Sequence, residues 1–105
     1  MVIIETSIFT NLVRQLLSDE EYRLLQAALV ARPALGVLIK GSGGLRKVRW
    51  APAHKSKSGG VRVIYYWAVA RDQILMLLIY SKTERDDLTP AQLRVLKGIV
   101  EEEYP

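Results

Sequence analysis

The sequence predicts an α+β protein in which a helical hairpin and a C-terminal helix cover an antiparallel sheet, in the order β-α-α-β-β-β-α. Apolar residues recur at helical spacing over residues 8–29 and 88–100, whereas residues 45–80 contain the runs that are typical of strands. Helices and strands segregated along the chain in this way favour the α+β class. Because 105 residues suit a single hydrophobic core, we expect one domain, residues 1–105.

The N-terminal part is predicted to form a strand and two helices. A β-branched run at residues 2–4 predicts the strand. Apolar residues then share one helical face, with Thr6 or Ser7 as the cap of the first helix. Ser18 and Glu21 have the spacing of a capping box, so a second helix begins there, and the next proline ends it.

The first basic strand follows a glycine-rich bend. Before the bend, residues 35–39 form an apolar run that fits either a turn or a short strand. After it, strand side chains alternate between faces, which predicts Lys47 and Arg49 on one face and Arg46 and Val48 on the other.

A second and a third strand are predicted to form a hairpin. Residues 61–69 are apolar on both faces except for Arg62, which is typical of a central strand. Residues 70–73 form the turn and residues 74–80 return. In the returning strand a period of two puts four side chains on one face: Met76, Leu78, Tyr80 and Lys82.

The start of the last helix is marked by several signals. Thr89 is the predicted cap, Pro90 occupies the first helical position and Gln92 completes a capping box. Leu88 and Leu93 have the spacing of a hydrophobic staple.

The composition excludes several classes of chemistry. The chain has no cysteine and one histidine, which excludes disulfides, thiol catalysis, thiolate metal sites and His-rich metal sites. No apolar run reaches the roughly 18–20 residues that cross a bilayer, and the N-terminus lacks the features of a signal peptide. We therefore expect a cytoplasmic protein without a membrane segment.

Positive charge is concentrated in the middle of the chain. The net charge is +4, and between Tyr22 and Arg71 there are ten Lys or Arg residues but no Asp or Glu. This clustering favours a polyanionic partner. Further on, Glu84, Asp86 and Asp87 fit a solvated run that leads into the helix cap better than a metal site.

The basic strands predict a phosphate site. If the three strands are sequential antiparallel neighbours, Lys47, Arg49, Arg62, Tyr80 and Lys82 converge at one end of the sheet. Guanidinium groups pair bidentately with phosphate oxygens, and lysines add point charge. The alternative is that these residues are solvated and only protect a strand edge from aggregation.

A further set of residues is predicted to bind RNA or the ribosome. Arg46 adds charge beside the site, and Trp50 is the better placed aromatic residue for stacking on a base. Lys55 and Lys57 lie in a Gly/Ser loop where they can clamp a nucleic-acid backbone or only keep the loop soluble. His54 is the one imidazole, which serves either as a general base or as an exposed loop residue.

Three motifs, GGLRKVR, GGVRVIYY and IYSKTERDDLT, follow the predicted helical hairpin in that order. Together they resemble the RelE/HigB family of bacterial toxins, most closely its HigB2-like branch, over nearly the whole chain. The resemblance implies a RelE-like fold and a toxin of a type II toxin–antitoxin pair. Such a toxin enters the ribosomal A site and cleaves messenger RNA by attack of the ribose 2′-hydroxyl, without metal or other cofactor. Its partners would be the ribosome, messenger RNA and a HigA-like helix-turn-helix antitoxin.

By motif position, Lys47, Arg49, Arg62 and Lys82 match the basic residues of the family. The sequence departs from RelE at Thr83, where a catalytic arginine is expected, and at Thr89, where a tyrosine is expected; Tyr80 or a loop lysine can fill this gap.

Two other functions fit the same residues. The first is that of the related ParE-like toxins, which use the same scaffold to bind DNA gyrase and lack the full basic set. The second is that of a non-catalytic RNA-binding module.

Overall fold

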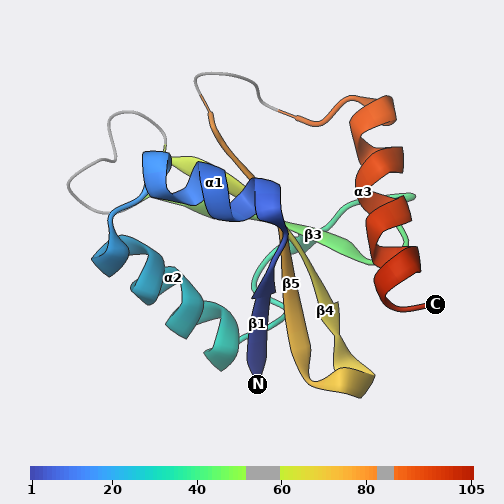
Figure 1. Ribbon diagram of the computed structural model, residues 1–105, viewed down its shortest axis with the longest axis horizontal. Coiled ribbons are helices and arrows are strands. Elements are labelled where there is room, and N and C mark those ends of the chain that lie inside the picture. Colours follow the sequence, from blue (N-terminus) through green and yellow to red (C-terminus); the bar gives the residue numbers. More distant parts are fainter. Residues whose placement is uncertain (52–59, 83–86) are drawn as a thin grey trace.

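The computed structural model describes residues 1–51, 60–82 and 87–105, in which a mixed five-stranded sheet lies between two layers of helix (Figure 1). The elements are β1 (Val2–Glu5), α1 (Ser7–Leu16), α2 (Asp19–Ala31), β2 (Val37–Leu38), β3 (Leu45–Trp50), β4 (Val61–Ala68), β5 (Gln73–Ser81) and α3 (Pro90–Glu103). The strands lie in the order β1-β5-β4-β3-β2. The predicted α+β class is confirmed.

One edge of the sheet differs from the prediction. β1 pairs with β5 in parallel, from Val2 opposite Gln73 to Glu5 opposite Met76, so the expectation of a wholly antiparallel sheet is wrong. Parallel pairing needs a long connection that returns the chain to the other end of the sheet. The helical hairpin forms the first part of that connection. No local sequence pattern in β1 shows whether the strand pairs in parallel or antiparallel.

The apolar run at residues 35–39 contains a short edge strand. β2 pairs with β3 through Val37 opposite Lys47 and Leu38 opposite Arg46. Both β2 side chains are exposed. The strand therefore contributes its backbone to the sheet and little to the core.

The helices cover both faces of the sheet: α1 and α2 lie on one face, and α3 lies on the other (Figure 1). The buried core of the α1/α2 face consists of Phe9, Val13, Leu17, Leu25, Leu29, Val48, Val61, Val63, Tyr65, Ile74, Met76 and Ile79. The buried core of the α3 face consists of Leu45, Ile64, Leu75, Leu77, Tyr80, Leu96 and Val100. None of the described helices is long and apolar enough to span a membrane.

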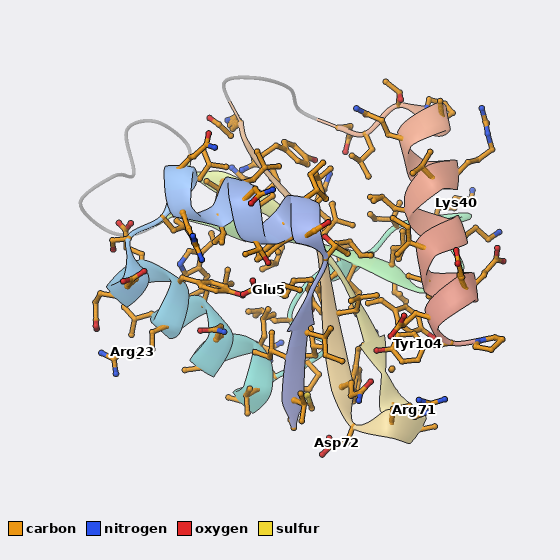
Figure 2. The ribbon with its side chains drawn as sticks, viewed as in Figure 1. Glu5, Arg23, Lys40, Arg71, Asp72 and Tyr104 are labelled. Carbon is orange, nitrogen blue, oxygen red and sulfur yellow. The ribbon has the colours of Figure 1, made fainter. Side chains whose placement is uncertain are left out.

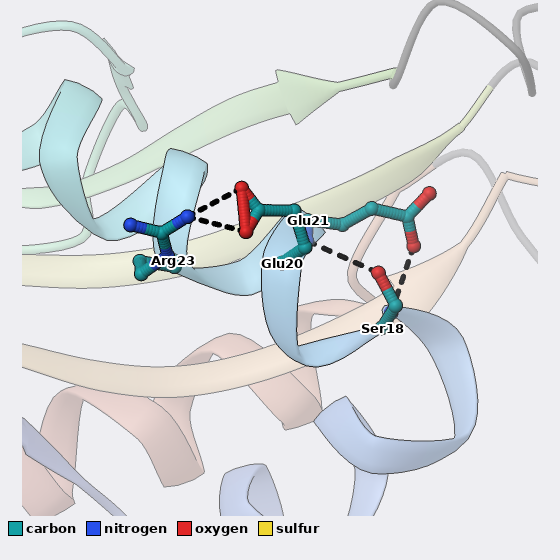
Figure 3. Close-up of polar contacts among 4 residues, drawn as sticks. All are labelled: Ser18, Glu20, Glu21 and Arg23. Atoms are coloured by element: carbon teal, nitrogen blue, oxygen red, sulfur yellow. Dashed lines mark hydrogen bonds and ion pairs between the residues drawn. The ribbon is translucent and has the colours of Figure 1, made fainter.

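The predicted helix caps are confirmed. Thr6 caps α1 by accepting a hydrogen bond from the backbone of the first turn. Ser18 and Glu21 form the capping box of α2, with both reciprocal hydrogen bonds present (Figure 3). Thr89 and Gln92 do the same for α3. Each box satisfies amide groups that a helix start leaves without partners.

A β-bulge interrupts the ladder between β4 and β5. Ile64 pairs with Leu78 but the next residue, Tyr65, pairs with Met76, so Leu77 is an extra residue on β5. Such an insertion shifts the alternation of side chains by one position.

The bulge changes the predicted faces of β5. Met76 lies in the core of the α1/α2 face, whereas Leu78 and Tyr80 pack on the α3 face. The expectation that Met76, Leu78, Tyr80 and Lys82 share one face is therefore wrong. A period of two holds only within an uninterrupted ladder.

The β4–β5 hairpin contacts the C-terminal end of α3 (Figure 2). A 3-10 turn, Val69–Arg71, and Asp72 in the left-handed region close the hairpin where the sequence predicted a turn. The Arg71 guanidinium lies 5.8 Å from the centre of the Tyr104 ring, and the Tyr104 hydroxyl donates to Gln73 Oε1 at 2.9 Å. These contacts hold the end of α3 against the sheet.

Candidate functional site

Three of the predicted site residues form a row across the sheet. Arg49 on β3 lies directly opposite Arg62 on β4, and Arg62 lies directly opposite Tyr80 on β5. Residues opposite each other in antiparallel strands have Cβ atoms roughly 5 Å apart on the same face. Arg49, Arg62 and Tyr80, which we call the arginine row, therefore lie side by side on the α3 face.

The arginine row runs from an exposed residue to two buried ones. Arg49 is exposed, whereas Arg62 and Tyr80 are 6% and 3% exposed. Of the two arginines, Arg49 is therefore the more accessible to an anion from solvent. Two guanidinium groups opposite each other can both donate hydrogen bonds to the oxygens of one anion held between them. Attraction is also stronger at Arg62, because burial lowers the local dielectric constant.

Lys82 lies one residue beyond the end of β5. Its backbone N–H donates to the carbonyl of Gly60 at 3.3 Å, which places it beside the start of β4. Lys82 is exposed, and it is two residues away from Tyr80 and from Arg62 in the paired strands. The structure therefore brings Lys82 close to the buried end of the arginine row.

Lys47 is joined to an acidic residue. It lies in the next row of the sheet, opposite Ile64, and its Nζ donates to Asp87 Oδ1 at 2.5 Å. Although the stretch between Tyr22 and Arg71 contains no Asp or Glu, one of its cations is therefore neutralised by an acid from outside it. Asp87 is far from Lys47 in the sequence, and the entry to α3 brings its carboxylate to the sheet.

Lys47 and Asp87 also line a cavity of about 250 Å³ between the sheet and the start of α3. Its other lining residues are Ile39, Lys40, Ile64, Leu88 and Leu93. Lys40, which belongs to none of the sequence motifs, adds a second ammonium group here and lies near α3 (Figure 2). Sequence offered no signal for it beyond its charge.

Arg46 and Trp50 lie on the opposite face from the arginine row. Arg46 donates from Nη1 to the carbonyl of Gly36 at 2.9 Å, and Trp50 packs against the α1/α2 core. Tyr65, opposite Arg46, accepts from the Gly36 N–H at 2.8 Å. Arg46 therefore has a structural role in fixing the loop before β2, and neither residue joins the predicted phosphate site.

Three predicted RNA-binding residues, His54, Lys55 and Lys57, lie outside the described residues, as does Thr83. Among residues 1–51, 60–82 and 87–105, no three His, Asp or Glu side chains gather as metal ligands do.

The fold and site define a small α+β protein with two opposed arginines, a neighbouring tyrosine and a nearby lysine, an arrangement suited to a phosphate diester. No protein-family model matches the chain.

Proposed function

We propose that the protein is the toxin of a type II toxin–antitoxin pair and a ribosome-dependent messenger-RNA endonuclease that acts in the cytoplasm. The observation that carries the proposal is the arginine row, with Arg49 opposite Arg62 and Arg62 opposite Tyr80. The resemblance of the surrounding motifs to the RelE/HigB family supports the same activity. A HigA-like antitoxin would neutralise the toxin by binding it.

The reaction needs stabilisation of charge and two proton transfers. The ribose 2′-oxygen forms a bond to the adjacent phosphorus while the bond from phosphorus to the 5′-oxygen breaks, which leaves a 2′,3′-cyclic phosphate and a 5′-hydroxyl. A base takes the proton of the 2′-hydroxyl, and an acid gives a proton to the 5′-oxygen. Negative charge grows on the phosphate oxygens, where Arg49 and Arg62 would stabilise it by being in place beforehand.

Lys82 is better placed than Lys47 for proton transfer. Lys82 is exposed beside the start of β4, whereas the Lys47 ammonium is bonded to the Asp87 carboxylate. Tyr80 lies next to Arg62 and supplies a hydroxyl group as the other candidate proton donor.

Arg49→Ala tests the proposal. Arg49 is exposed, so its removal should leave the fold stable while cleavage falls by roughly 10²–10³-fold, the usual effect of losing one group that stabilises transition-state charge. Arg23→Ala is the matched control, because Arg23 is an exposed arginine on α2 that pairs with Glu20 of the same helix (Figure 3). Growth after induction and sequencing of cleaved messages on ribosomes are the measurements.

Equal growth arrest by the wild type and Arg49→Ala, or intact messages on stalled ribosomes, contradicts the proposal. DNA breaks with stable messenger RNA would indicate a ParE-like toxin that binds gyrase. Salt-dependent RNA binding without toxicity would indicate a non-catalytic RNA-binding module.

A further inference from the structure

The geometry points to a nucleobase-binding groove between α1 and α3, which takes a base next to the cleaved phosphate and sets the sequence preference of cleavage. This inference rests on the proposed endonuclease function. The groove has a volume of about 270 Å³ and is lined by Ile8, Leu12, Gln15, Leu16, Leu78, Ile79, Tyr80 and Gln92. It is smaller than the roughly 300–1,000 Å³ of sites for drug-sized ligands, which suits a single planar base.

The groove is continuous with the arginine row through Tyr80. Tyr80 lines the groove and is also the residue directly opposite Arg62. When a phosphate is held between Arg62 and Arg49, the base of the adjoining nucleotide can reach across Tyr80 into the groove. The phosphate site and the groove therefore form neighbouring parts of one nucleotide-binding surface.

The lining of the groove excludes a charged ligand and suits a base. All eight lining residues are uncharged, so the phosphate has no partner there. Leu12, Leu16 and Leu78 offer apolar walls to the faces of a base, and Tyr80 offers an aromatic ring. The lining therefore suits a neutral, flat ligand with polar edges, such as a nucleobase.

Two side-chain amides in the lining can read the edge of the base. Gln92 Oε1 accepts from the Thr89 N–H at 2.9 Å, which fixes the amide and leaves the N–H groups of Gln92 to donate. Gln15 Nε2 donates to the Asn11 carbonyl at 3.4 Å, which leaves Gln15 Oε1 to accept. One donor and one acceptor from two helices distinguish bases by their hydrogen-bonding pattern.

Binding by the folded protein can be followed through amide resonances, with the four ribonucleoside 5′-monophosphates and inorganic phosphate as probes. We expect nucleotides to shift the resonances of Leu12 and Leu78, with one base bound roughly fivefold or more tightly than the others. Inorganic phosphate should shift only resonances near Arg49 and Arg62. Groove resonances that stay fixed with all four nucleotides would overturn the inference and leave the groove to a protein partner.

Two variants and a control locate the effect. Ile8→Trp fills the mouth of the groove at a side chain that is 51% exposed, and Gln15→Leu removes the acceptor. Both should weaken nucleotide binding at least fivefold and abolish the base preference, with phosphate binding unchanged. Asn11→Leu changes an exposed residue of α1 outside the groove lining and should match the wild type. Nucleotide binding that is equal in all four proteins would contradict the inference.

Cleavage maps separate this inference from the proposed function. If both hold, Gln15→Leu alters which bases flank the cuts while messages are still cleaved. If the wild type cleaves no message but binds one base in the groove, the proposed endonuclease function is wrong and the inferred nucleobase site stands. If Ile8→Trp and Gln15→Leu cleave messages with the base preference of the wild type, the endonuclease function stands and the inferred nucleobase site is wrong.

Discussion

Lys47 Nζ lies 2.5 Å from Asp87 Oδ1, so a residue in the middle of β3 is bonded to the segment that leads into α3. The Lys47 side chain is 28% exposed and that of Asp87 is 75% exposed. An ion pair of this exposure contributes about 0–1 kcal/mol to stability. Its larger effect is to cancel a positive charge beside Arg49, on the face where the arginine row lies.

Asp87→Asn should strengthen RNA binding. With the carboxylate removed, Lys47 is available to neutralise one more phosphate, so the salt dependence of log K should steepen by about one unit of slope. Fluorescence anisotropy with a labelled single-stranded RNA at several salt concentrations measures both quantities. Asp72→Asn is the control, because Asp72 is an equally exposed carboxylate that pairs with the Met1 amino group near the hairpin turn. Equal slopes for the two variants would show that Asp87 does not compete with RNA.

The two candidate lysines should differ in their effect on cleavage. Lys82→Met should slow single-turnover cleavage on ribosomes by about 10²-fold or more, the usual contribution of a general acid or base. Lys47→Met should reduce the cleavage rate less than Lys82→Met does, because the Lys47 ammonium is already bonded to Asp87. Both substitutions keep an unbranched side chain. A larger loss for Lys47→Met would reverse the assignment of the proton-transfer residue.

Local features of the fold could be predicted from the sequence. Ser18 with Glu21 and Thr89 with Gln92 are each three residues apart, and both capping boxes form as predicted. A cap depends only on the residues of one helical turn, so its signal is complete within a short stretch.

Features that join distant segments could not be predicted. The direction of β1 depends on its pairing with β5, and the bulge at Leu77 moves Met76 to the face opposite that of Tyr80. The bond between Lys47 and Asp87 likewise exists only because α3 begins over the sheet. In the site, alternation correctly put Lys47 and Arg49 on one face and Arg46 on the other, but the burial of Arg62 follows from packing that the sequence pattern does not contain.

Thr6 joins the cap of α1 to the bulge of β5, so its removal should cost more than that of an ordinary cap. Thr6 Oγ1 accepts from the Phe9 N–H at 3.1 Å and donates to the Leu77 carbonyl at 3.0 Å. Thr6→Val should lower the free energy of unfolding by about 2 kcal/mol, from a lost cap and a carbonyl left without this donor. Urea unfolding measures the change.

Thr89→Val is the matched control for Thr6→Val. Thr89 makes the same kind of cap on α3, where Oγ1 accepts from the Gln92 N–H at 3.1 Å. Its loss should cost about 1 kcal/mol. Equal losses for the two variants would mean that the bond to Leu77 contributes nothing to stability.

Gly36 is required where the loop before β2 passes over Tyr65. A Cβ at Gly36 would lie 2.8 Å from Tyr65 Cε1 and 3.0 Å from the Lys47 carbonyl oxygen, so either the ring or the backbone must move. Gly36→Ala should destabilise the protein by about 1–3 kcal/mol, the usual cost of overpacking. Thermal or urea unfolding measures it.

Gly98→Ala provides the opposite control. Gly98 lies within α3, and among the described residues no atom outside its own helix turn lies within 4 Å of a Cβ placed there. The substitution should stabilise the protein by about 0.5–1 kcal/mol, because alanine favours a helix interior. A Gly36→Ala protein as stable as Gly98→Ala would show that the loop adjusts freely.

Tyr22 should make stability fall at alkaline pH. Burial, and then the hydrogen bond to Glu5 and the charge of that carboxylate, raise the pKa of Tyr22 well above its ordinary value. The fold therefore favours the neutral phenol, while the unfolded chain ionises near pH 10, the ordinary value for tyrosine. The stability that depends on this proton is complete below about pH 10 and is lost as the pH rises further.

Tyr22→Phe isolates this effect. At pH 7 the variant should be less stable than the wild type by about 1–2 kcal/mol, because the hydrogen bond to Glu5 is lost. The difference should shrink as the pH rises above about 10, since only the wild type loses the contribution of Tyr22. Urea unfolding of both proteins from pH 7 to 11 measures it, and lysines and other tyrosines cancel in the comparison. A difference that stays constant over this range would mean that the phenol ionises equally in both states, and that the contact with Glu5 does not hold its proton.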